Sequence, residues 1–128
     1  MIYLDTSVAL AHLLAEDRRP PDALWTKPLV ASRLVEYELW TRLNARGLSA
    51  SHGEAARRLV ERLALMELLP NVLDRAKEPF PAPVRTLDAL HLASILFLRE
   101  RVPAIELASY DDRLAATARA LGIRIVPL

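Results

Sequence analysis

Short apolar runs alternate along the chain with longer stretches in which apolar residues recur every three or four positions. The first pattern is typical of buried strands and the second of helices. We therefore predict strands at residues 2–4, 29–31, 66–69, 104–109 and 123–126. We predict helices at residues 7–16, 33–46, 53–65, 72–78, 86–99 and 112–121, with a loop at 49–53 and a proline-rich turn at 79–83.

The order of these elements predicts the fold class. Strands that alternate with helices form α/β domains with a largely parallel sheet. At 128 residues the chain fits one domain with a substantial core, and it contains no internal repeat or long linker. We therefore predict a single α/β domain over residues 1–128 with a mostly parallel central sheet. In such sheets the functional crevice lies beyond the carboxyl ends of the strands.

Four acidic residues stand where predicted strands or helices begin or end, and most of them interrupt apolar surroundings: Asp5, Glu38, Asp88 and Asp111. A carboxylate in an apolar place is costly unless a cation or hydrogen-bond donors meet it. Asp5 and Asp111 each follow a predicted strand, so fold logic puts both at the same rim of the sheet. A hard divalent cation is the common partner of converging carboxylates. Each aspartate is equally suited to be a helix N-cap, and the sequence alone leaves both interpretations open.

The helix predicted at residues 86–99 is apolar nearly all round, which predicts that it is buried. Its few polar residues, Asp88, His91 and Ser94, follow one another at a spacing of three and therefore form a line along the helix. His91 is a possible metal ligand, but a lone histidine on an apolar helix is more often hydrogen-bonded within the core. We interpret it in that second way.

The helix predicted at residues 33–46 carries two candidate acids. Glu36 and Glu38 point to well-separated directions, because each residue advances by about 100° around a helix. Arg42 is one turn beyond Glu38 and could form an ordinary ion pair with it. Periodicity alone does not choose between the two glutamates.

Composition limits the possible functions. The chain has no cysteine, which excludes disulfides, thiolate nucleophiles and cysteine zinc sites. Its longest apolar run, residues 92–98, is too short to span a bilayer, and no secretory leader precedes Asp5, so we expect a cytoplasmic protein with no membrane partner. Almost all of its basic residues are arginine. Arginine suits phosphate binding, although GC-rich codon usage explains the same excess.

Other carboxylate chemistries fit the sequence less well. A phosphoaspartate receiver needs an acidic pair after its first strand and a lysine after its last, whereas Lys27 and Lys77 both stand elsewhere. A haloacid-dehalogenase-like phosphatase needs a second aspartate at the position of Ser7. The glycine patterns of nucleotide-binding loops are absent.

Four stretches match, in order, the acidic motifs of the PIN-domain family, and the chain resembles the VapC-type toxins of bacterial and archaeal toxin–antitoxin modules within it. The stretches are Ile2 to Val8 around Asp5, Ser32 to Leu39 around Glu38, Arg85 to Ser94 around Asp88, and Ser109 to Leu114 around Asp111. The second motif places its acid six residues after the serine, and this spacing selects Glu38 over Glu36. The fourth motif opens with Ser109 where threonine is common, which still leaves a hydroxyl.

The resemblance implies a PIN-like α/β/α sandwich and an endoribonuclease that depends on Mg²⁺, with Mn²⁺ as an alternative. It implies that the four acids of the motifs are the catalytic and metal-binding residues: Asp5, Glu38, Asp88 and Asp111. Thr6, Ser109 and Asp112 are then candidates for hydrogen bonds to those carboxylates or for contacts with phosphate.

The resemblance also implies three partners, namely an RNA substrate, a cognate small antitoxin and a second copy of the chain in a homodimer. Candidates for the antitoxin groove or the dimer contact are the apolar residues Leu34, Trp40, Leu43, Leu59 and Leu63. Two other functions stay open. One is a PIN nuclease that processes RNA outside a toxin–antitoxin module, and the other is a non-catalytic partner that binds antitoxin or RNA.

Overall fold

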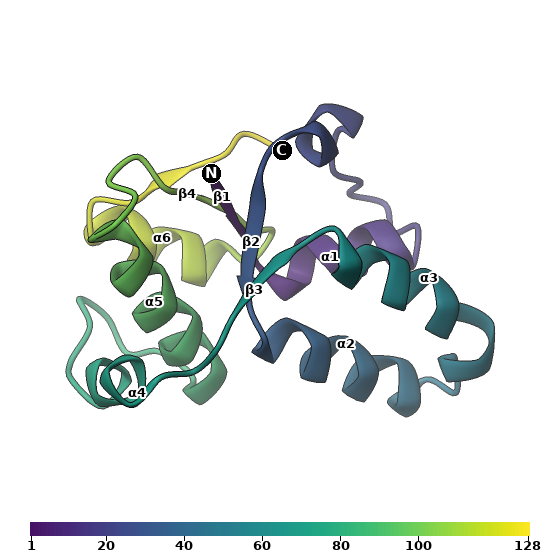
Figure 1. The fold of residues 1–128 in the computed structure, drawn as a ribbon, viewed down its shortest axis with the longest axis horizontal. Helices are drawn as coiled ribbons and strands as arrows, with labels where there is room; N and C mark the ends of the chain where they lie inside the picture. The colour runs from purple at the N-terminus through teal and green to yellow at the C-terminus, as the bar shows by residue number, and fades with distance from the viewer.

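Five short strands make up one sheet in the computed structural model, which describes residues 1–128 (Figure 1). The strands are β1 (Ile2–Leu4), β2 (Leu29–Ser32), β3 (Ala64–Met66), β4 (Glu106–Ala108) and β5 (Arg124–Ile125). The helices are α1 (Thr6–Leu13), α2 (Leu34–Ala45), α3 (Ser49–Glu61), α4 (Pro70–Ala76), α5 (Thr86–Arg99) and α6 (Asp112–Ala120), with a 3-10 helix, η1 (Asp22–Thr26). All neighbouring strands run parallel, which confirms the predicted α/β class.

The strand order is β3-β2-β1-β4-β5, so β1 lies at the centre. Tyr3 of β1 is opposite Val30 of β2 on one side and Leu107 of β4 on the other. The chain first builds outward from β1 to β3 and then returns to the other side of β1 for β4 and β5. This reversal creates a topological switch point between β1 and β4, where open α/β sheets usually bind their ligands. Asp5 and Ser109 directly follow these two strands and therefore stand at the crevice.

Helices cover both faces of the sheet, so the molecule has three layers (Figure 1). Successive residues of a strand point to opposite faces. Leu4 therefore belongs to a core with Val8 of α1 and Leu39 of α2, on the face that α3 also covers. Tyr3 belongs to a second core with Leu92 of α5, on the face that α6 also covers. These two cores confirm the predicted α/β/α sandwich.

Helix α3 begins earlier than predicted. It starts at Ser49, so the loop expected at residues 49–53 is wrong. Gly53 lies inside the helix, where a Cβ atom would stand 2.8 Å from Cη2 of Trp40 on α2. The glycine therefore marks a close approach between two helices and does not mark a loop.

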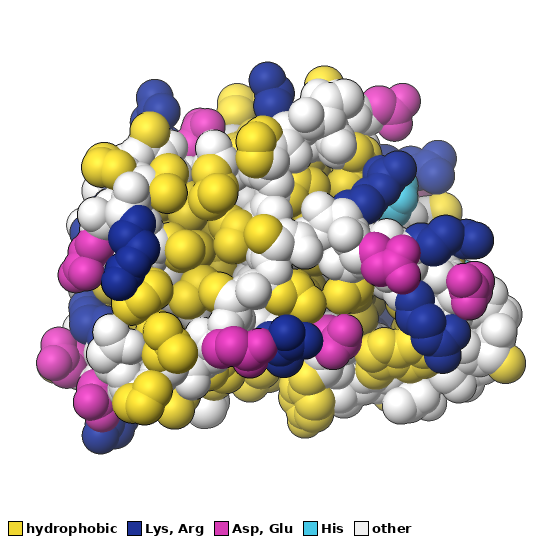
Figure 2. Space-filling model, viewed as in Figure 1, with side chains coloured by type: hydrophobic (Ala, Val, Ile, Leu, Met, Phe, Trp, Pro, Cys, Tyr) yellow, Lys and Arg dark blue, Asp and Glu magenta, His cyan; other side chains and the backbone are white.

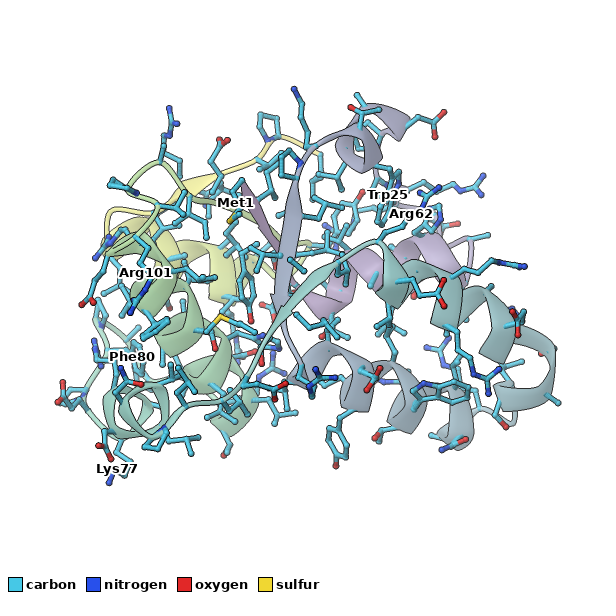
Figure 3. All side chains as sticks on the ribbon, in the orientation of Figure 1. Met1, Trp25, Arg62, Lys77, Phe80 and Arg101 are labelled. Carbon is cyan, nitrogen blue, oxygen red and sulfur yellow. The ribbon has the colours of Figure 1, made fainter.

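The third strand and the first helix are also displaced from the predictions. β3 ends at Met66, where the strand was expected to begin, because the following residues lead into Pro70, which begins α4. α1 ends at Leu13 instead of residue 16, and η1 is not among the predicted elements. Trp25 of η1 packs against the first core and lies beside Arg62, as Figure 3 shows.

Charged and apolar side chains are distributed unevenly on the face seen in Figure 2. Charged side chains gather over α2 and α3, and apolar side chains dominate the part that contains α4 and α5. Leu43, Leu59 and Leu63 are buried, so they cannot form the antitoxin groove or dimer contact expected of them. The reason is that α2 and α3 pack against each other. None of the helices combines the length and the apolarity that crossing a bilayer requires.

Candidate active site

The acidic residues of all four motifs line one hollow at the carboxyl ends of β1 and β4. The hollow has a volume of about 650 Å³. Its acidic lining residues are Asp5, Glu16, Glu38, Asp88 and Asp111. Glu16 is an exposed residue beyond the end of α1 and was not a candidate from the sequence. The fold thus brings together four acids that lie up to 106 residues apart, from Asp5 to Asp111 (111 − 5).

Asp5 is almost fully buried, with 5% of its surface exposed. It is the N-cap of α1, and its Oδ2 atom accepts hydrogen bonds from the backbone N–H of Ser7 at 3.3 Å and the Ser7 hydroxyl at 2.5 Å. The Ser109 hydroxyl donates to the same oxygen at 2.9 Å. These donors make an ionised carboxylate tolerable in a buried place. They also leave Oδ1 free of any protein hydrogen bond.

Glu38 is held by two donors from other elements. Its Oε1 atom accepts a hydrogen bond from the Thr6 hydroxyl at 2.8 Å and lies 2.6 Å from Nε2 of His91. The other ring nitrogen of His91, Nδ1, lies 2.7 Å from the hydroxyl of Tyr3, which itself accepts the backbone N–H of Ser32 at 3.2 Å. A buried chain of hydrogen bonds therefore fixes the position of the Glu38 carboxylate. The interpretation of His91 as a hydrogen-bonded core residue is confirmed.

Of the two glutamates on α2, only Glu38 lines the hollow. Glu36 instead approaches Arg33, with 3.9 Å between Oε1 and Nη1, and both side chains are well exposed. The ion pair between Glu38 and Arg42 that sequence spacing allows is not formed, although Arg42 also lines the hollow. The geometry therefore agrees with the register in which Glu38 belongs to the site.

Burial and charge act together on the titrating groups around the hollow. Burial lowers the pKa of His91, but the hydrogen bond with Glu38 and the charges of Asp5, Glu38 and Asp88 outweigh it, so the pKa of His91 lies above its usual 6.5. Burial raises the pKa of Asp88 in spite of the nearby Arg85. The fold thus disfavours the charged form of Asp88, and an added cation would offset this cost.

Arg85 connects the two remaining acids. Its Nε atom is 3.1 Å from Oδ2 of Asp88, and its Nη2 atom is 2.8 Å from Oδ2 of Asp111. The other oxygen of Asp111, Oδ1, caps α6 by accepting the backbone N–H groups of Arg113 and Leu114 at 3.0 and 3.1 Å. Sequence reasoning missed Arg85 as a site residue. The only signal was its position three residues before Asp88.

The three additional candidates from the sequence, Thr6, Ser109 and Asp112, divide into two groups. Thr6 donates to Glu38, and Ser109 donates to Asp5 and accepts the backbone N–H of Asp111 at 2.9 Å. Both are therefore placed to orient the carboxylates. Asp112 is exposed in the first turn of α6 and does not line the hollow, so its contact with phosphate stays a prediction.

The donor atoms of this hollow fit a hard divalent cation. Carboxylate oxygens are the protein ligands that Mg²⁺ and Mn²⁺ prefer. As the side chains stand, no three acidic or histidine residues converge closely enough to hold a metal ion. Arg85 lies between Asp88 and Asp111, whereas protein donors orient Asp5 and Glu38. A cation that binds both Asp88 and Asp111 would therefore displace Arg85, while Asp5 and Glu38 can keep their donors.

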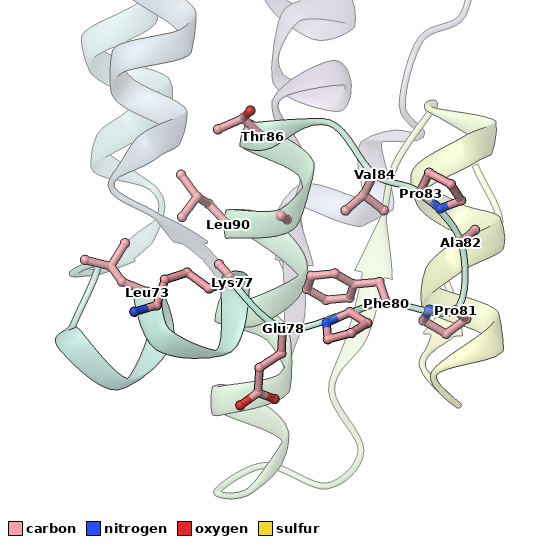
Figure 4. Close-up of a pocket in the computed structure, with 13 residues that line it drawn as sticks. Leu73, Lys77, Glu78, Phe80, Pro81, Ala82, Pro83, Val84, Thr86 and Leu90 are labelled. Carbon is pink, nitrogen blue, oxygen red and sulfur yellow. The ribbon is translucent and has the colours of Figure 1, made fainter.

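A second and larger hollow of about 800 Å³ lies between α4, the proline-rich segment and α5 (Figure 4). Its walls include Leu73, Phe80 and Leu90, and its only charged lining residues are Lys77 and Glu78. With a single carboxylate, it does not offer the chemistry of the acidic hollow.

The family of the chain is established over nearly its full length. The PIN domain matches residues 2–120, and the chain belongs to the PIN-domain family. Relatives of the chain include ribonucleases named VapC. Ribonuclease VapC46 of Mycobacterium tuberculosis strain H37Rv is 36% identical over 130 residues, which cover 98% of this chain and 95% of the relative. Ribonuclease VapC47 of M. tuberculosis strain CDC 1551 is 31% identical, with 95% and 93% covered.

Two solved structures share the fold. A toxin–antitoxin complex from Klebsiella pneumoniae contains a chain with a TM-score of 0.72 and 15% identity, over 100% of this chain and 98% of that one. VapC20 of M. tuberculosis, described as a sarcin–ricin loop cleaving toxin, has a TM-score of 0.71 and 24% identity over 100% of both chains. Because both identities are below 25%, the structural similarity establishes the fold alone.

Proposed function

We propose that the chain is a divalent-metal-dependent endoribonuclease and acts as the toxin of a type II toxin–antitoxin module. The observation that carries this proposal is the gathering of Asp5, Glu38, Asp88 and Asp111 around one hollow at the switch point of the sheet. The full-length relatives support it, because they are ribonucleases of the VapC group.

In this proposal the four carboxylates hold Mg²⁺ or Mn²⁺. Together they place a charge of about −4 in a small hollow, and cations must offset such repulsion at neutral pH, of which Arg85 supplies only one. When bound, the metal supplies Lewis acidity toward a phosphodiester and a water molecule. Asp5 would receive it with its carboxylate oriented by Ser7 and Ser109.

The remaining residues of the hollow suit the substrate. Glu38, which His91 and Thr6 hold by hydrogen bonds, would bind a second metal ion or orient the attacking water. Arg18 and Arg42 line the same hollow and offer donors for backbone phosphates. Attack by water does not need the 2′-hydroxyl of the substrate. The preference for RNA is therefore supported by the relatives and not by the geometry.

We further propose a cytoplasmic protein with a cognate small antitoxin and a homodimeric state. A free nuclease of this kind would damage its own cell, so it needs an inhibitor that reaches the acidic hollow. An arginine or lysine of the antitoxin, inserted among the carboxylates, would be attracted to them and would exclude the metal.

The test compares the wild type with Asp5→Asn, which keeps an N-cap side chain but removes the charge. We expect the wild type to cut RNA with Mg²⁺ and to lose this activity with EDTA, and we expect the variant to cut only at background. Expression of the wild type should arrest growth unless the neighbouring gene is co-expressed. A variant that cuts at the wild-type rate would contradict the nuclease proposal. Cleavage without growth arrest, and without a co-purifying small protein, would favour an RNA-processing nuclease.

A further inference from the structure

A protein cation already lies between two of the four acids. Arg85 is the N-cap residue of α5, yet its side chain makes no capping hydrogen bond. A positive charge at a helix N-terminus also opposes the helix dipole. Its guanidinium instead reaches Oδ2 of Asp88 at 3.1 Å and Oδ2 of Asp111 at 2.8 Å. The two carboxylates therefore explain where this side chain lies, and the helix does not.

We propose that Arg85 exchanges partners during the reaction cycle. In the metal-free protein it binds Asp88 and Asp111, and once a divalent metal takes these carboxylates it binds a backbone phosphate of the RNA. This inference rests on the proposed metal-dependent nuclease function. It makes Arg85 an internal competitor of the metal and a substrate-binding residue, two roles that follow from one side chain.

The surroundings of Asp111 allow the exchange without loss of structure. Its Oδ1 atom alone accepts the two N–H groups at the start of α6, from Arg113 and Leu114. Oδ2 is the oxygen that contacts Arg85. Release of Arg85 therefore frees one oxygen for a metal and keeps the helix capped.

The ion pairs are also weak enough to be exchanged. The Arg85 side chain is 68% exposed, whereas those of Asp88 and Asp111 are 18% and 23% exposed. Exposed ion pairs contribute little to stability, because water screens them and a long side chain loses freedom in forming them. A divalent ion carries twice the charge and approaches oxygen to about 2.1 Å. The metal is therefore expected to win the competition, and Arg85 stays at the rim, where its planar donors suit a phosphate.

The test measures Mn²⁺ affinity by isothermal titration calorimetry for the wild type, Arg85→Gln and the control Arg42→Gln. Arg42 lines the same hollow but forms no ion pair with the acids, so its loss reports the general effect of removing one positive charge. We expect Arg85→Gln to bind Mn²⁺ about three- to tenfold more tightly, the range expected when two exposed ion pairs of this kind no longer compete. The control should change by less than about twofold, since bulk water screens unpaired charges.

Cleavage kinetics at saturating metal give the second readout. Arg85→Gln should raise the KM for RNA, so the two effects of this variant have opposite directions. A damaged site would weaken metal and RNA binding together. Arg85→Lys keeps the charge but cannot bridge both carboxylates with one fork, so its Mn²⁺ affinity should fall between those of the wild type and Arg85→Gln. It also keeps the test available if Arg85→Gln does not fold.

Several results would overturn the inference. Equal or weaker Mn²⁺ binding by Arg85→Gln would show that Arg85 does not compete with the metal. If Arg42→Gln binds Mn²⁺ more tightly to the same extent, the effect is explained by the loss of net charge and not by Arg85. An unchanged KM would remove the role in RNA binding. If the wild type itself binds no Mn²⁺ and cuts no RNA, the proposed function fails instead, and this outcome is distinct from the others.

Discussion

Individual carboxylates in this protein serve the fold and the site together. Asp5 caps α1 with Oδ2, and Asp111 caps α6 with Oδ1. In each residue the second oxygen is left for another partner, which for Asp111 is Arg85. Cap and site are therefore compatible roles for one aspartate. This explains why N-cap propensity alone could not distinguish them.

The sharpest residue-scale prediction compares Glu38→Gln with Glu36→Gln. Glutamine keeps the size of the side chain and an acceptor for Thr6 and His91, but it removes the charge from the hollow. We expect Glu38→Gln to lower the initial rate of RNA cleavage by about 10²-fold or more, the usual contribution of a positioned acid–base group. Glu36 has only a long, exposed contact with Arg33, so Glu36→Gln should change the rate by less than about twofold. Equal losses of cleavage rate would show that the second motif was assigned in the wrong register.

At the scale of elements, the periodicity of helix α2 directs some of its side chains into the core and another toward the acidic hollow. Val35, Leu39 and Leu43 are completely buried, and they recur at a spacing of four residues. Glu38 is the neighbour of Leu39 but points into the hollow, and Tyr37 on its other side is 61% exposed. The packing of Leu39 against the sheet thereby determines where the Glu38 carboxylate lies.

This arrangement predicts unequal effects for the two neighbours of Glu38. Leu39→Ala should lower the free energy of unfolding by about 2–5 kcal/mol, because it leaves a cavity in the first core. Tyr37→Ala should change it by less than about 0.5 kcal/mol, as is usual for exposed positions. Urea unfolding followed by circular dichroism measures both. A similar loss for the two variants would contradict the orientation of α2.

At the scale of the whole molecule, the strand order concentrates negative charge at one place. The switch point between β1 and β4 gathers two N-cap acids, Asp5 and Asp111, and one acid each from α2 and α5 around a hollow, and the partly buried Asp88 has a raised pKa there. If a cation binds there as proposed, it should relieve the repulsion between these acids and stabilise the protein. The proposed function therefore predicts a linkage between stability and metal binding.

This linkage predicts that the stability difference between Asp88→Asn and the wild type changes sign between a buffer with EDTA and one with Mg²⁺. In EDTA the variant should be at least as stable as the wild type, because burial disfavours the charged carboxylate that it removes. With Mg²⁺ at a hundredfold excess over its Kd, the wild type should gain about 2.7 kcal/mol, and the variant should gain much less. Melting temperatures in the two buffers measure the difference. A wild type that Mg²⁺ does not stabilise would contradict the linkage.

The sequence by itself determined the types of the five strands and six α-helices and the α/β class, and its resemblance to a known family selected the acids of the four motifs. It predicted helix 86–99 with both ends correct, because the proline-rich segment 79–83 and the apolar surroundings are local signals. The start of α3 was predicted wrongly because a distant residue decides it. Gly53 indicated a loop in the sequence but lies inside α3, where Trp40 approaches it from another helix.

Only the tertiary structure decided the contacts inside the site. The chain of hydrogen bonds from Tyr3 through His91 to Glu38 and the bridge from Arg85 to Asp111 join elements on different parts of the sheet. Hydrophobic periodicity and helix capping act within one or two turns, so the sequence displays them directly. Pairing between side chains far apart in the chain depends on the strand order and on the direction of each side chain. Those are properties of the assembled sheet, which no local pattern contains.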